Sequence, residues 1–159
     1  MAIPTPSRGL HRFETVTELP LSPEEVFPFF AAPENLERIT PPELRFRILT
    51  PLPIEVRQGT LIEYRLRLEG LPFKWLTEIS AWDPPRSFTD RQLKGPYHTW
   101  IHSHSFEATD TGTRMRDRVD YRLPFWPLGE VALPFVRRKV RRIFAHREKV
   151  IREILCQGD

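Results

Sequence analysis

Cysteine is almost absent from the sequence: Cys156 is the single one among 159 residues. The chain can therefore form neither an internal disulfide nor a cysteine-based zinc cluster, and a reducing, cytoplasmic setting is expected. No run of 18 apolar residues occurs, and the start "MAIPTPSRGLHR" lacks the apolar core of a signal peptide. We expect a protein without a membrane span that stays in the cell.

Glycine is scarce as well, with 7 residues against 17 prolines. A glycine-rich phosphate loop and a glycine-flanked nucleophilic serine are both missing, which argues against nucleotide-dependent and serine-hydrolase chemistry. The net charge of +3 is modest. Basic residues gather in "RRKVRR", residues 137–142, and could attract phosphates or acidic membranes.

The middle of the chain has the period-two alternation of antiparallel strands, joined by short Pro, Gly and Asp connections. Residues 12–19 form a first strand, and Ser22 followed by Pro23 starts a helix. Proline at 28 and at 33 should keep that helical region in short pieces. The later strands are predicted at 45–49, 60–68, 73–82, 87–93, 98–108 and 113–123.

The chain closes with a predicted helix at 134–155, whose apolar residues recur on one side. The order of a strand, short helices, about six strands and a long helix indicates an α+β fold. A length of 159 residues suits one domain, residues 1–159, with a core from about 10 to 155.

Three of the five histidines lie in "HTWIHSHSF", residues 98–106. Alternation divides this strand into two faces, and its aromatic residues indicate which face points inward. That inner face carries Trp100, His102, His104 and Phe106.

The following strand has an acid, Asp117, on its inner face. A four-residue loop "TDTG", 109–112, with Gly112 able to take positive φ, joins the two strands and sets His104 opposite Asp117. A slip of one residue would pair inner with outer residues. The remaining inner pairs are His102 with Val119, Trp100 with Tyr121 and Phe106 with Met115.

The last helix has one charge in its apolar stripe: Arg147 falls between Val140 and Ile151 on a helical wheel. A guanidinium there needs an acid, carbonyl groups or a ligand anion, since an unpaired buried charge costs several kcal/mol.

Three interpretations of these polar residues stay open. A metal could take His102 and His104, with Asp117 as a third donor, but no further ligand motif supports it. A polar core would have Asp117 accept from His104 while a backbone group satisfies His102.

The third interpretation, which we favour, is a ligand cavity between sheet and helix, because aromatic walls with a few converging polar groups are typical of small-molecule sites. No metal or cofactor is expected in it. The candidate lining residues are Tyr64, Trp75, Trp100, His102, His104, Asp117, Tyr121 and Arg147.

The sequence also resembles the START-like helix-grip superfamily (SRPBCC), over roughly residues 10–155. The segments that carry the likeness are "LPLSPEEVFPFFAAPENLERITPPELRFRI", "GPYHTWIHSHSFEATDTGTRMRDRVDYRLPF" and "PFVRRKVRRIFAHR". They are similar to a small bacterial ligand-binding branch, sometimes described as cell-division inhibitors, a label that nothing in these residues supports. The resemblance implies a curved sheet of about seven strands, two short helices after the first strand, and a hydrophobic tunnel beneath the last helix.

These patterns predict binding or carriage of a small hydrophobic molecule, such as a lipid or polyketide, with an acidic or carbonyl end at Arg147 and the His104/Asp117 pair. The enzyme alternative is a cyclase, dehydratase or hydrolase that uses His102, His104 and Asp117 for acid/base chemistry. A third alternative is an interaction module built on 137–142; peripheral membrane contact fits it, whereas a nucleic-acid partner is not expected.

Overall fold

The computed structural model describes residues 7–157. It contains seven strands, three α-helices and two short 3₁₀ helices among the described residues. In chain order these are β1 (Leu10–Leu19), α1 (Pro23–Ala31), α2 (Pro33–Ile39), η1 (Pro42–Leu44), β2 (Arg47–Ile48), β3 (Leu61–Leu68), β4 (Leu71–Asp83), β5 (Ser87–Lys94), β6 (Thr99–Thr109), β7 (Gly112–Arg122), η2 (Leu128–Ala132) and α3 (Leu133–Leu155).

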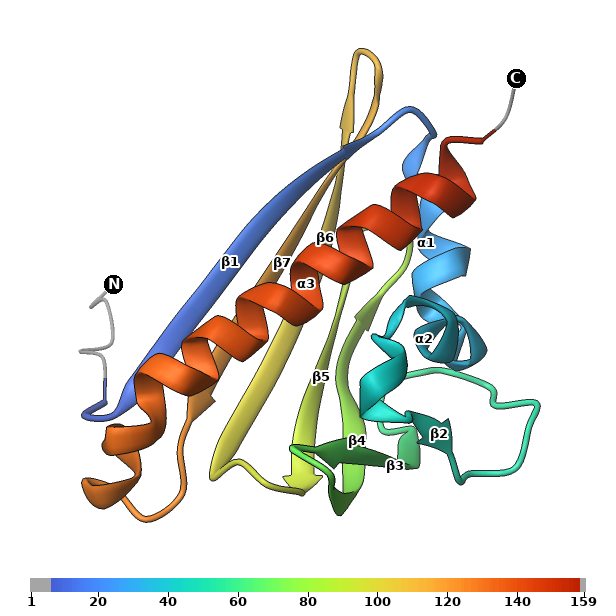
Figure 1. Cartoon of the computed structure of the whole chain (residues 1–159). Coiled ribbons are helices and arrows are strands. Elements are labelled where there is room, and N and C mark those ends of the chain that lie inside the picture. The colour runs from blue at the N-terminus through green and yellow to red at the C-terminus, as the bar shows by residue number, and fades with distance from the viewer. Residues whose placement is uncertain (1–6, 158–159) are drawn as a thin grey trace.

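All seven strands form one antiparallel sheet in the order β1-β7-β6-β5-β4-β3-β2. The sheet curves, and α3 runs along its concave side, with α1 and α2 beside the C-terminal half of the helix (Figure 1). This is the helix-grip arrangement that the resemblance implied, so the predicted α+β fold class is confirmed. None of the helices within residues 7–157 is long and apolar enough to cross a membrane.

The β6–β7 hairpin has the predicted register, with His104 opposite Asp117 and Trp100 opposite Tyr121. Its loop is shorter than expected, because Thr109 also pairs with Gly112 and only two residues remain between the strands. Gly112 has φ +149°, and a Cβ there would lie 2.0 Å from the carbonyl oxygen of Leu19. Glycine is therefore required by close approach of β1 as well as by backbone conformation.

The buried face of β4 changes partway along the strand. Trp75, Thr77 and Ile79 are buried as the alternation requires, but the pairing with β5 shifts between Ile79 and Ala81. A β-bulge of this kind moves the following side chains to the opposite face. Trp82 consequently packs against Phe27 of α1, with ring centroids 5.2 Å apart.

Helix α1 begins where the capping pattern places it. The carboxylate of Glu25 accepts hydrogen bonds of 2.9 Å from both the backbone N–H and the hydroxyl of Ser22. The helical region is in two short pieces as expected, α1 with nine residues and α2 with seven, and Pro33 opens α2. Pro28 lies inside α1, where its missing N–H removes one backbone hydrogen bond of the helix.

Helix α3 buries the stripe that the sequence predicted. Val140, Phe144 and Ile151 are buried, and Arg147 is buried among them with 8% of its surface exposed. Phe144 packs against Phe13 of β1, with ring centroids 5.0 Å apart. The helix thus brings a cation to the concave side of the sheet.

Candidate functional site

A cavity of about 160 Å³ lies on the concave side of the sheet. Helices α1, α2 and α3 and strands β2 to β6 all contribute to its wall. The wall is mostly aliphatic and aromatic, with a small polar section from β5, β6 and α3. Its lining residues are Phe29, Phe30, Ala31, Ala32, Pro33, Asn35, Leu36, Ile39, Phe46, Ile48, Val56, Ile62, Tyr64, Trp75, Thr77, Ile79, Phe88, Asp90, Trp100, His102, His104 and Arg147.

Six of the eight residues predicted to line a cavity are in this wall: Tyr64, Trp75, Trp100, His102, His104 and Arg147. The other two are not. Asp117 is buried behind the histidines, and Tyr121 packs in a core cluster with Val140 and Phe144. Both were placed on the correct face of β7, but that face is covered by neighbouring side chains at these positions.

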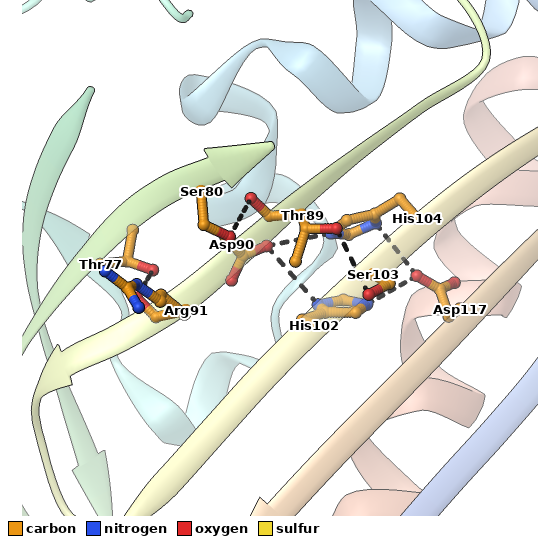
Figure 2. A network of polar contacts seen from close by, with 9 residues as sticks. All are labelled: Thr77, Ser80, Thr89, Asp90, Arg91, His102, Ser103, His104 and Asp117. Atoms are coloured by element: carbon orange, nitrogen blue, oxygen red, sulfur yellow. Dashed lines mark hydrogen bonds and ion pairs between the residues drawn. The ribbon is translucent and has the colours of Figure 1, made fainter. Parts of the chain in front are cut away.

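The two histidines lie between two carboxylates (Figure 2). Nε2 of His102 donates to Oδ1 of Asp117 at 2.7 Å, and Nε2 of His104 donates to Oδ2 of Asp90 at 3.1 Å. Nδ1 of His104 lies 3.1 Å from the same Asp117 oxygen, without hydrogen-bond geometry. The polar-core expectation, with Asp117 accepting from His104 and a backbone group satisfying His102, is corrected on both counts.

Asp90 is the functional candidate that the sequence analysis missed. It stands opposite His102 in the β5–β6 pairing, and its carboxylate belongs to both the network and the cavity wall. One signal was present: Asp90 shares its face of β5 with Phe88, a residue of core character. The ring of Phe88 stacks on His104, with centroids 4.1 Å apart.

Burial and the carboxylates act in opposite directions on the histidines. Burial would lower the pKa of His104, but Asp117 and Asp90 outweigh it and raise the pKa. Burial and the neighbouring His104 charge together lower the pKa of His102, against the pull of Asp117. Of the two histidines, His104 therefore holds a proton more readily and His102 less readily than a free imidazole.

The carboxylates remain ionised although they are buried. Burial would raise the pKa of Asp117, but its contacts with His102 and His104 hold that pKa far below its usual range. The pKa of Asp90 is lowered despite burial, by the hydrogen bond from His104 and by the charges of His102, His104 and Arg147. The two histidines and Arg147 thus favour the charged form of both carboxylates.

Arg147 is the member of this group without a direct partner. Among residues 7–157 its guanidinium has no carboxylate within 4.0 Å; it lies over the ring of Phe144, 4.9 Å from the centroid. It acts on Asp90 only from a longer distance. A buried cation that faces a cavity without its own anion retains unused capacity to bind one.

The aromatic section of the wall has a second unused donor. Trp75 stacks on Tyr64 and meets Trp100 edge to face, with centroids 5.8 and 5.5 Å apart. The indole Nε1 of Trp75 is buried and has no acceptor among the described residues. Buried donors of this kind are uncommon in folded proteins.

A metal is the alternative occupant for the polar section. Asp90, His102 and His104 each offer one donor atom, all within 4.8 Å of one another, and two imidazoles with a carboxylate suit zinc. The third donor would be Asp90 and not Asp117 as the sequence suggested. The charges disfavour a divalent ion, because the two carboxylates raise the pKa of His104 and so oppose the proton loss that metal binding requires, and because the Arg147 cation lines the same cavity.

Comparisons with known proteins place this site in a family context. A search of curated proteins finds no match. Among solved structures, the chain is similar to protein CV1439 from Chromobacterium violaceum, with TM-score 0.69 and 13% identity over 95% of this chain and 99% of that one. It is also similar to protein Ms6760 from Mycobacterium smegmatis, with TM-score 0.66 and 19% identity over 91% and 90%.

A third similar structure is major latex-like protein 151 from Panax ginseng, with TM-score 0.64 and 13% identity over 92% of this chain and 97% of that one. At these identities the structures establish the fold alone. The family model described as "Polyketide cyclase / dehydrase and lipid transport" matches residues 19–147, which include the histidine strand and Arg147. The chain therefore belongs to the polyketide cyclase/dehydrase and lipid transport family.

Proposed function

We propose that this protein binds one small hydrophobic molecule in the cavity, with an anionic or carbonyl end directed at Arg147. The observation that carries the proposal is a buried guanidinium that has no carboxylate within 4.0 Å among residues 7–157, in the wall of a mostly apolar cavity. The family description, which includes lipid transport, supports a ligand of this class.

The apolar wall supplies affinity without chemical selectivity. Burial of hydrocarbon contributes about 25 cal/mol for each Å² removed from water, so any molecule of suitable shape gains from entering. A volume of about 160 Å³ accommodates one ring or a short acyl chain. A longer ligand would extend through the open side of the cavity.

The polar section supplies selectivity for the head group. Among residues 7–157, Arg147 is the cation of the cavity wall that has no carboxylate within 4.0 Å, so an entering anion pairs chiefly with its guanidinium. A carbonyl oxygen could instead accept a hydrogen bond from Arg147. A charge-assisted hydrogen bond at a buried site contributes about 1.5–3 kcal/mol.

Native mass spectrometry of freshly purified protein, compared with the same sample denatured, is the first experiment. An organic adduct lost on denaturation would support the proposal and identify the ligand class. Displacement of a fluorescent anionic probe by octanoate and by 1-octanol, which share one hydrocarbon chain, would then isolate the head group.

Arg147→Met should weaken octanoate binding about 10- to 100-fold and leave 1-octanol binding nearly unchanged. Arg152→Met is the matched control, because Arg152 is an exposed arginine of the same helix, paired with Glu148 at 3.1 Å. Equal octanoate affinity in both variants would overturn the head-group assignment. Failure of both probes to bind wild-type protein, with no adduct, would overturn the ligand cavity itself.

The histidine network favours acid/base catalysis as a second candidate function. His104 touches two carboxylates, which raise its pKa, and it lines the cavity, so in its protonated form it could donate a proton to a bound carbonyl or hydroxyl group. Cyclisation, dehydration and hydrolysis all use such a donor. With the ligand identified, His104→Gln should abolish its turnover while the affinity for the ligand persists. If wild type showed no turnover and His104→Gln lost affinity, binding alone would be the function.

A further inference from the structure

The segment between β7 and α3 exposes an unusual amount of apolar surface. Phe125, Leu128 and Val131 are 83%, 78% and 87% exposed, and Trp126 and Phe135 are exposed at 41% and 53%. These five large hydrophobic residues all lie within residues 125–135, which we call the apolar segment. Contiguous exposed apolar surface commonly marks a site of contact with a protein or a membrane.

The backbone of this segment is anchored, so the exposure is not that of a loose loop. Trp126 packs so tightly on Gly9 that a Cβ there would lie 2.4 Å from its ring, and the guanidinium of Arg122 lies 5.8 Å from the ring centroid. Glu130 bonds His11 of β1 at 2.8 Å. Phe125 has φ +59°, a conformation that bulky residues rarely adopt. The fold thus holds the apolar side chains outward.

Basic residues adjoin the apolar segment on the first turns of α3. Arg137, Arg138 and Arg141 are exposed, and none has an ion-pair partner among residues 7–157. Lys139 pairs with Glu69 and Arg142 with Glu43. Glu130, already bonded to His11, is the one acid from 124 to 142, so this end of the molecule is positively charged.

A shallow groove lies beside the same residues. It has a volume of about 430 Å³ between the β3–β4 turn and α3, and Phe135 forms part of its wall. Four basic residues and two acids line it, so the groove has a net positive charge. The charged lining residues are Arg67, Arg138, Lys139, Arg142, Glu43 and Glu69.

We infer that this end of the molecule docks on a bilayer that contains anionic lipids. The apolar side chains would enter the interfacial region, the three unpaired arginines would face lipid phosphates, and the groove could receive a head group. Protruding aromatic and aliphatic residues beside basic ones are the pattern of interfacial membrane binding, whereas a nucleic acid offers no environment for Leu128 and Val131.

The surface is separate from the ligand cavity, since none of these residues lines the cavity. It lies where α3 begins, at the opposite end of that helix from α1 (Figure 1). The sequence analysis considered the basic run, residues 137–142, without the apolar residues before it. The structure shows that the aromatic residues precede it and project from the same end.

Co-sedimentation with vesicles tests the inference, using phosphatidylcholine vesicles with and without phosphatidylglycerol. Wild-type protein should bind the anionic vesicles, and high salt should weaken the binding. The triple variant Phe125→Ser, Leu128→Ser, Val131→Ser should lower the partition coefficient at least about tenfold. Arg138→Gln with Arg141→Gln should lower it about 30-fold, at about 1 kcal/mol for each arginine.

Matched controls separate this surface from general stickiness and charge. Val16→Ser with Leu61→Ser removes exposed apolar side chains elsewhere, and Arg47→Gln with Arg65→Gln removes two exposed charges from β2 and β3. Both control pairs should bind like wild type, and circular dichroism checks that every variant is folded.

Three outcomes would overturn the inference. These are no binding of wild type to anionic vesicles, equal binding to neutral ones, and equal losses in the control pairs. Analytical ultracentrifugation gives one more such outcome. If wild type were a dimer and only the apolar triple variant were a monomer, a second copy of the chain would cover the surface. None of these results depends on whether the cavity holds a ligand.

Discussion

Replacing Asp117 with asparagine tests the role assigned to the buried network. The substitution keeps the size of the side chain and removes its charge. Asp117 is 4% exposed, accepts from His102 at 2.7 Å and lies 3.1 Å from Nδ1 of His104. The asparagine oxygen can still accept one hydrogen bond, but the positive charge of His104 loses one of its two carboxylates.

The magnitude follows from the cost of breaking a buried charge pair, which is about 3–5 kcal/mol. Because one hydrogen bond survives, we expect a loss near the lower limit, about 3 kcal/mol of the free energy of unfolding at pH 7. For a chain of this size that corresponds to a fall in Tm of about 6–12 °C. Urea titration followed by tryptophan fluorescence measures the free energy, and calorimetry measures Tm.

Asp120→Asn is the matched control on the same strand. Asp120 is 9% exposed and pairs with Arg12 at 2.7 Å and with Arg118 at 3.3 Å, but those arginine side chains are 55% and 44% exposed, so water screens both pairs. Its loss should therefore cost less than the loss of the Asp117 charge. If Asp117→Asn cost no more than Asp120→Asn, the two histidines would not depend on the Asp117 charge, and the role assigned to that carboxylate would be refuted.

Three further predictions concern pH, the unpaired cation and the hairpin. The free energy of unfolding should be greatest near pH 6.5, the pKa of a free histidine. As the pH rises above this value, the stabilisation from the raised pKa of His104, which faces Asp90, Asp117 and Arg147, is lost. As the pH falls below it, the lowered pKa of His102 destabilises the folded state, because the unfolded chain then binds a proton that the folded one does not. Urea titrations from about pH 5 to 9 measure this free energy, and a steady rise of the free energy with pH would contradict the prediction. Arg147→Met should raise the free energy of unfolding of ligand-free protein by about 1 kcal/mol, measured the same way; a loss would mean the cation is already paired. Gly112→Ala should lower it by about 2 kcal/mol, and an unchanged Tm would show that the turn relaxes.

Part of the site follows from local sequence because side-chain direction in a strand depends only on residue parity. Parity placed His102 and His104 together, and the short loop before Gly112 set Asp117 opposite His104. The helical period likewise placed Arg147 among apolar neighbours. These features need no long-range information beyond the presence of one core.

Asp90 required the tertiary structure. The connection between β5 and β6 contains "GPY", which is not one of the short turns that fix the pairing of two strands. The sequence therefore does not show that Asp90 lies opposite His102. The bulge in β4 between Ile79 and Ala81 is equally invisible to a simple alternation. Pairing across such connections depends on the packing of the whole sheet.

The sequence by itself determined the fold class, the inner face of each hairpin strand and the charge within α3, because each depends on a repeating local period. Only the tertiary structure decided which inner residues border empty space and which lie behind others, as with His104 and Asp117. It also decided that the apolar segment stays uncovered. A cavity and a bare surface arise from the distances between elements, and residue periodicity carries no information about those distances.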